Sequence, residues 1–147
     1  HHAAQEGHAV VIEVLVKYKA SVSSVAKDSV QPIHIATRDG REHLTNTLLR
    51  LSADLTAADA NGRLPIHYAV DGGHAAVTTS LLMHRADLTS SDGNAQEPLH
   101  QAVWSGHAPM VDLLLQQRAN IAAIEEQGGR QPLHLAAISG HAQLITF

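Results

Sequence analysis

Residues 131–137 read Gln-Pro-Leu-His-Leu-Ala-Ala, and a Gly-His pair follows at residues 140–141. The same pattern recurs upstream, with steps of 33, 33, 33 and 34 residues between the histidines. In all five copies an alanine stands two positions after the histidine and a glycine six positions after it. A fixed period near 33 residues is the signature of a repeat array. The histidines that mark the five copies are His1, His34, His67, His100 and His134.

Each copy is predicted to contain a short helix, a turn, a longer helix and a polar finger. The proline before each of the last four histidines suits a first helical turn, because its missing N–H and fixed φ are tolerated there. The glycine suits the positive φ that ends a short helix. Apolar residues three and four apart then predict a second helix, and a stretch rich in Asp, Asn and Gly predicts a hairpin finger. The last finger has one additional residue, which accounts for the 34-residue step.

This pattern resembles the ankyrin repeat over the whole chain. The family combines Pro-Leu-His-x-Ala, Gly-His, an aliphatic run and a Gly-Ala-Asp tail, and the corresponding tails here are residues 18–22, 51–55, 84–88 and 117–121. The resemblance implies an all-α fold, a helical solenoid with short β-hairpin fingers. It also implies a threonine that caps the first helix, and this chain has other residues there: Gln31, Leu64, Glu97 and Gln131.

We expect one array over residues 1–147, with three complete units at 25–57, 58–90 and 91–123 and partial units at 1–24 and 124–147. Because each unit contacts only its neighbours, the core should be continuous and aliphatic. Neither end has the polar outer face that terminal repeats need. We therefore interpret the chain as a fragment of a longer one, while His1 and His2 also fit a residual purification tag.

Composition excludes several classes of function. A net charge of −4 with 10 basic residues and no basic run argues against nucleic-acid binding. The chain contains no cysteine, so it has neither disulfides nor thiolate metal sites. This composition is typical of an intracellular protein, and we expect a cytoplasmic one. No apolar run is long enough to cross a bilayer, so membrane insertion is not expected. We expect a monomer.

The 12 histidines do not predict a metal site. Most occupy the two repeat positions, where stacking makes a ladder instead of the convergent cluster that a metal needs. The resemblance implies that the imidazole of Pro-Leu-His bonds to the backbone between neighbouring hairpins. Four copies carry a second histidine after the glycine, and Arg41 stands there in the remaining copy. The other histidines (His2, His43 and His84) are expected to be exposed, and no metal or cofactor is predicted.

No catalytic residue is predicted, and the chain is not expected to be an enzyme. Ser, His and Asp are plentiful, but each either recurs at the repeat period or stands alone, whereas a triad needs one arranged constellation. No phosphate-binding loop, nucleophile elbow or His-Glu-x-x-His motif is present. The carboxylates of Glu125 and Glu126 are expected to be solvated turn residues.

Function should lie at positions that the repeat leaves free. The resemblance implies a concave groove lined by finger tips and by two residues late in each first helix. Trp104 is the only tryptophan, and tryptophan is enriched among residues that dominate binding energy; its alternative role is packing across the neighbouring repeat. The predicted partner-binding residues are Arg38, Asp71, Trp104 and Ile138 on the helices, Asn61, Arg63, Asn94, Glu126 and Arg130 on the fingers, and Ile124 at the edge of the last finger.

Three functional hypotheses remain open at this stage. The first is a protein-binding module or scaffold that holds a partner protein or peptide in the concave groove. The second is a regulatory or targeting segment of a larger enzyme, channel or effector that docks on its own chain, since fold alone does not determine function. The third is an architectural spacer with no specific ligand.

Overall fold

The computed structural model describes residues 1–125 and 128–141. In these ranges the chain forms α-helices, one short 3₁₀ helix and loops, with no strand. The α-helices are α1 (His2–Gln5), α2 (Ala9–Lys17), α3 (Pro32–Arg38), α4 (Glu42–Arg50), α5 (Pro65–Asp71), α6 (Ala75–Met83), α7 (Pro98–Trp104), α8 (Ala108–Gln116) and α9 (Pro132–Ser139), and the 3₁₀ helix η1 is Lys27–Ser29.

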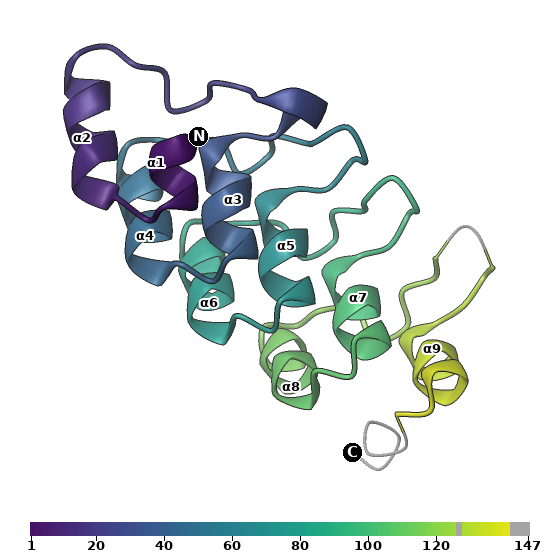
Figure 1. Ribbon diagram of the computed structural model, residues 1–147. Helices are drawn as coiled ribbons and strands as arrows, with labels where there is room; N and C mark the ends of the chain where they lie inside the picture. Colours follow the sequence, from purple (N-terminus) through teal and green to yellow (C-terminus); the bar gives the residue numbers. More distant parts are fainter. Residues whose placement is uncertain (126–127, 142–147) are drawn as a thin grey trace.

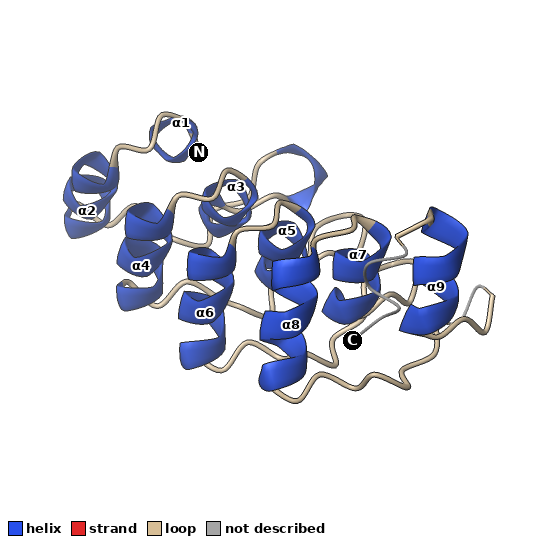
Figure 2. Ribbon diagram, turned by 90° about the horizontal axis from the view of Figure 1, so that it is seen from below, coloured by secondary structure: helices blue, strands red, loops and turns tan. Residues whose placement is uncertain are grey.

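The helices stack in two rows (Figures 1 and 2). The first helices, α1, α3, α5, α7 and α9, form one row, and each packs against the next. The second helices, α2, α4, α6 and α8, form the other row behind it, and the loops that lead to the next unit extend as fingers on one side (Figure 1). This arrangement confirms the predicted helical solenoid. No helix in the described ranges is long and apolar enough to cross a membrane.

Proline and glycine delimit the first helices, as predicted. Four of these helices begin at a proline, and the residue before it has extended backbone. The glycine that follows each first helix has a positive φ, which is +67° at Gly40. A Cβ on Gly40 would lie 2.6 Å from Nδ1 of His74 in the next repeat. This glycine is therefore required both by its backbone conformation and by the close approach of the neighbouring unit.

The core is aliphatic and runs along the whole stack. Leu48, Leu81 and Leu114 occupy the same place on successive second helices, and each is 0 % exposed. Ala36 and Ala69 are equally buried on the first helices, where a small side chain lets neighbouring helices pack closely. Burial of this kind stabilises the fold by about 25 cal/mol for each Å² of apolar surface removed from water.

The fingers are hairpin-like turns without strands in the described residues. Each closes with a backbone bond across its base, from the N–H of Asp59 to the carbonyl of Arg63 at 3.1 Å, for example. A second backbone bond joins neighbouring fingers, from Gly93 N–H to the carbonyl of Asn61 at 2.8 Å. The last finger closes between Glu125 and a residue one position farther along, as its additional residue predicts. These few backbone bonds do not form the β-hairpin strands that the resemblance implied.

Candidate functional site

The histidines in the first turn of the first helices form a structural ladder. His34 Nδ1 accepts the N–H of Gln31 at 2.9 Å, so its Nε2 carries the proton and donates to the carbonyl of Ala57 at 3.0 Å. The same pair of bonds recurs at His67 and His100. This confirms the predicted bond between imidazole and the backbone of the next finger. Burial lowers the pKa of His34 and His67, which favours the neutral imidazole that these two bonds need.

The histidines after the glycines form a second ladder, and the sequence did not predict its hydrogen bonds. Nε2 of His74 donates to the carbonyl of Arg38 at 3.0 Å, and Nε2 of His141 donates to the carbonyl of Trp104 at 3.1 Å. Arg41 replaces this histidine in one repeat, and its guanidinium donates to the carbonyl of Gln5. Each bond therefore holds the backbone at the end of the preceding first helix, where the groove residues lie. The regular Gly-His spacing was the signal that could have revealed it.

No group of three or more potential metal ligands converges within the described ranges. The two ladders explain this arrangement, since they separate equivalent histidines by one repeat and engage the nitrogens with backbone groups. The histidines therefore stabilise the stack.

Buried carboxylates hold the bases of two middle fingers. Asp59 is 6 % exposed; its Oδ1 accepts the N–H groups of Asn61 and Arg63, both at 2.8 Å, and its Oδ2 accepts the hydroxyl of Tyr68 at 2.6 Å. Burial opposes ionisation, but these hydrogen bonds hold the pKa of Asp59 below its usual value. Burial and the Asp59 carboxylate raise the pKa of Tyr68 to about 12. The finger base is therefore a rigid polar unit.

The expectation that Glu125 is solvated is wrong. Glu125 is 3 % exposed, and its Oε2 accepts a hydrogen bond from Nε2 of Gln96, on the preceding finger, at 3.1 Å. Its Oε1 lies 3.6 Å from the guanidinium of Arg130. The neighbouring finger covers the carboxylate, which is why the turn composition did not reveal its burial. Glu126 lies outside the described residues.

The middle of the groove is polar and internally paired. Arg63 Nη2 lies 3.0 Å from Oδ2 of Asp71, and its guanidinium carbon lies 4.5 Å above the ring of Tyr68. Ser105 donates to the other carboxylate oxygen of Asp71 at 3.2 Å. The Arg63 side chain is only 22 % exposed. The structure therefore brings these two predicted residues together, and each neutralises the other.

The remaining predicted residues are distributed along the groove. Arg38 pairs with its neighbour Asp39 at 3.1 Å. Asn61 and Asn94 are exposed on two successive fingers. Each of these asparagines follows a buried aspartate and donates its backbone N–H to that carboxylate.

The C-terminal end of the groove is apolar and exposed. Trp104 is 50 % exposed at the end of α7, and Ile138 is 58 % exposed at the corresponding place on α9. Ile124 is 61 % exposed at the last finger. A hollow of about 210 Å³ lies beside Trp104, and its lining residues are Gln96, Trp104, Glu125, Arg130 and Leu135.

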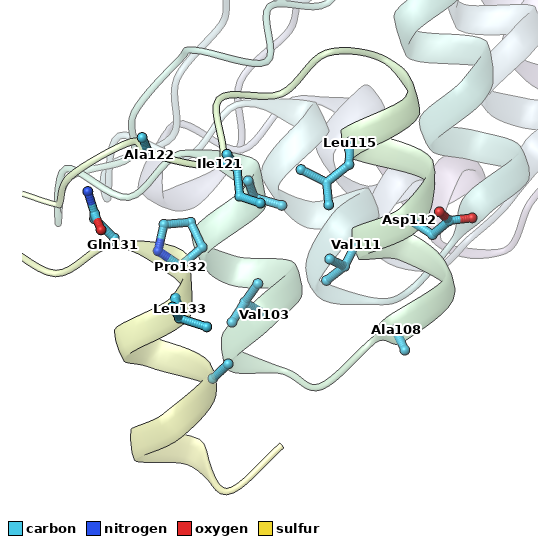
Figure 3. A pocket seen from close by; sticks show the side chains of 12 residues that line it. Val103, Ala108, Val111, Asp112, Leu115, Ile121, Ala122, Gln131, Pro132 and Leu133 are labelled. Atoms are coloured by element: carbon cyan, nitrogen blue, oxygen red, sulfur yellow. The ribbon is translucent and has the colours of Figure 1, made fainter. Parts of the chain in front are cut away.

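A larger apolar cavity of about 660 Å³ lies elsewhere, between α7, α8 and α9 (Figure 3). Within the array each second helix packs against its own first helix and against the preceding second helix. The cavity is bounded by α7, α8 and α9, so its apolar lining comes from neighbouring helices of the stack. Val111, Leu115 and Leu133 point into it (Figure 3). We therefore attribute this cavity to the packing of the array and assign it no ligand.

The chain was compared with known proteins. A family model described as ankyrin repeats, in three copies, matches residues 1–92 and 78–147. Together these matches span the whole chain. A search of the curated proteins gives no match.

Proposed function

Because the chain belongs to the ankyrin-repeat family, we propose that its concave surface binds an extended segment of a partner protein. Ankyrin repeats are generally protein–protein interaction modules. The observation that carries the proposal is the exposure of Trp104, which is 50 % accessible on the face formed by the first helices and the fingers. A half-exposed tryptophan beside a hollow provides a large, rigid surface for a partner side chain.

The backbone that carries Trp104 is already held in place. Its carbonyl accepts the hydrogen bond from His141, and its helix packs against both neighbouring first helices. A residue on a fixed backbone loses little conformational freedom on binding. This organisation favours Trp104 as an anchor over a role in packing, because half of its surface remains accessible.

The groove changes character along its length, and so should the partner. Ile124, Ile138 and Trp104 provide apolar contacts at the C-terminal end. Arg38 and Asp71 belong to the polar part, where exposed ion pairs contribute only about 0–1 kcal/mol each. We therefore expect the partner to place apolar side chains at the C-terminal end and hydrogen-bonding groups over the middle, near Arg63 and Asn61. Asn94 lies on the finger between these two parts, and Arg130 on the last finger lines the hollow beside Trp104.

Affinity capture from a cell lysate, with identification by mass spectrometry, tests the proposal. Wild type is compared with Trp104→Ala and Ile138→Ser, and circular dichroism checks that helicity is unchanged. Tyr18→Ala is the matched control, because Tyr18 is 79 % exposed at α2, away from the apolar end of the groove. We expect a protein that wild type and the control retain and both groove variants lose. Equal capture by all four proteins would show that the site lies elsewhere.

A further inference from the structure

Half of the cations in this chain have no acidic partner in the described residues. Five of the 10 Lys and Arg residues form ion pairs. Of the other five, Lys27 lies on a finger. The remaining four lie at the ends of second helices, along one edge of the stack (Figure 2). These four residues are Lys17, Lys19, Arg85 and Arg118, and we call them the basic edge.

Three of the four cations have an unfavourable backbone conformation. Lys19, Arg85 and Arg118 have φ values of +70°, +67° and +67°, at equivalent positions two residues beyond their helices, and Ser52 takes this position at +63°. Glycine adopts this left-handed region readily, whereas a Cβ crowds the following carbonyl. A cation near a helix C-terminus is favoured by the dipole, but Lys17 already provides one within its last turn. Within residues 1–125 and 128–141, no ion pair or hydrogen bond of these side chains offsets the strain.

Arg85 and Arg118, from adjacent repeats, line one open hollow of about 480 Å³. Leu82 and Leu88 provide its apolar surface, and Asp87 is its only acidic lining residue. Oδ1 of Asp87 accepts the backbone N–H and the hydroxyl of Thr89, both at 2.8 Å. The hollow therefore combines two unpaired guanidinium groups with aliphatic surface, on a chain whose net charge is −4.

We propose that the basic edge is a second interaction surface, which binds an acidic peptide segment of a partner protein. A carboxylate side chain enters between Arg85 and Arg118, because the planar guanidinium fork matches carboxylate geometry. An adjacent aliphatic side chain covers Leu82 and Leu88. A membrane or a nucleic acid would need a continuous cationic surface, whereas Ser52 interrupts this row. The proposal does not depend on the concave groove.

Fluorescence anisotropy with purified chain 1–147 tests the proposal. The probe is a fluorescein-labelled peptide of alternating Glu and Leu, and a Lys-Leu peptide controls for apolar binding. The double variant Arg85→Gly/Arg118→Gly removes both guanidinium groups and suits the left-handed backbone. We expect it to bind the Glu-Leu peptide roughly tenfold or more weakly, with a melting temperature no lower than that of wild type. Ser52→Gly is the matched control, because it changes the same backbone position without removing charge, and its affinity should equal that of wild type.

Three results would overturn the proposal. Wild type could fail to bind the Glu-Leu peptide, or the double glycine variant could bind it equally well. Alternatively, wild type could prefer phosphatidylserine vesicles or polyuridylate to the peptide, which would assign the cations to another class of anion. Trp104→Ala should bind the peptide like wild type. If this variant loses binding while the double glycine variant keeps it, the peptide occupies the concave groove and the basic edge is not the site.

Discussion

The hydroxyl of Tyr68 donates a 2.6 Å hydrogen bond to Oδ2 of Asp59, which joins helix α5 to the base of its own finger. In the next repeat the corresponding bond runs from Nε2 of Gln101 to Oδ2 of Asp92, at 3.1 Å. One repeat earlier the same two positions are both apolar, as Ala26 and Ile35. In these three repeats the buried carboxylate and its donor are therefore present together or absent together, as expected when a buried charge needs a partner.

Removing the Tyr68 hydroxyl should destabilise the array. We expect Tyr68→Phe to lower the free energy of unfolding by about 1–3 kcal/mol, because a carboxylate that is 6 % exposed loses a donor. Urea denaturation followed by circular dichroism measures the change. Tyr18→Phe removes a hydroxyl from a residue that is 79 % exposed and serves as the control. A loss of the same size in both variants would mean that the Tyr68–Asp59 bond adds nothing.

Stability should fall as the pH is lowered below 6.5. Burial lowers the pKa of His34 and His67 in the folded state below the ordinary histidine value of about 6.5. Below this value the unfolded chain binds protons that the native state excludes, so stability is lost progressively towards the lowered folded pKa. Above pH 6.5 the two histidines are neutral in both the folded and the unfolded chain, so they no longer make the stability depend on pH. Urea midpoints between pH 7.5 and about 5.5 measure this dependence.

The His43→Gln variant checks that the two ladder histidines cause this pH dependence. His43 is exposed on α4, and the variant should show the same pH dependence as wild type. Burial raises the pKa of Glu97, which acts in the opposite direction at lower pH, so the measurement stops above that range. A midpoint that does not change with pH would contradict the prediction.

The helix cap before α7 can be improved. Glu97 precedes α7 without a side-chain cap hydrogen bond, and no donor in the described part of the chain reaches its buried Oε2. We expect Glu97→Thr to raise the free energy of unfolding by about 1 kcal/mol relative to Glu97→Val, because the threonine hydroxyl can accept an unpaired N–H of the first turn. The valine variant has the same shape without the hydroxyl, so the difference isolates the cap. Thermal and urea denaturation of both variants measure it, and equal stabilities would refute it.

Two glycines should differ sharply in their tolerance of alanine. Gly40 and Gly129 both have a positive φ, of +67° and +61°. A Cβ on Gly40 would lie 2.6 Å from the His74 ring, whereas no atom of the described residues lies within 4 Å of a Cβ on Gly129. We expect Gly129→Ala to lose about 1 kcal/mol from backbone strain alone, and Gly40→Ala to lose about 1–3 kcal/mol more through the clash. Equal denaturation midpoints for the two alanine variants would contradict the prediction and show that the His74 ring can move away from the added Cβ.

Several features of the site follow from the repeat register, and others do not. The register correctly predicted the ladder through His34. The pairing of Arg63 with Asp71 was not predicted, because it joins residues on a finger and a helix whose separation depends on how the chain folds between them. The burial of Glu125 was missed for a similar reason, since Gln96 from the preceding finger makes the contact. A turn exposed to solvent and a turn covered by a neighbouring finger have the same local composition, so the composition around Glu125 did not reveal its burial.

The sequence by itself determined the repeat, the order of its helices and the backbone conformation at the prolines that begin the first helices and the glycines that follow them. These properties depend on steric preferences and apolar periodicity within about 33 residues, which are local and recur in every unit. Only the tertiary structure decided which charges are paired and which remain available. The folding of one unit joins Arg63 to Asp71 and ties the buried Asp59 to Tyr68, but Arg85 and Arg118 have no acidic partner in the described residues. Charge pairing depends on the distances between side chains on different elements, such as Arg63 on a finger and Asp71 on a helix, and only the folding and stacking of the units set those distances.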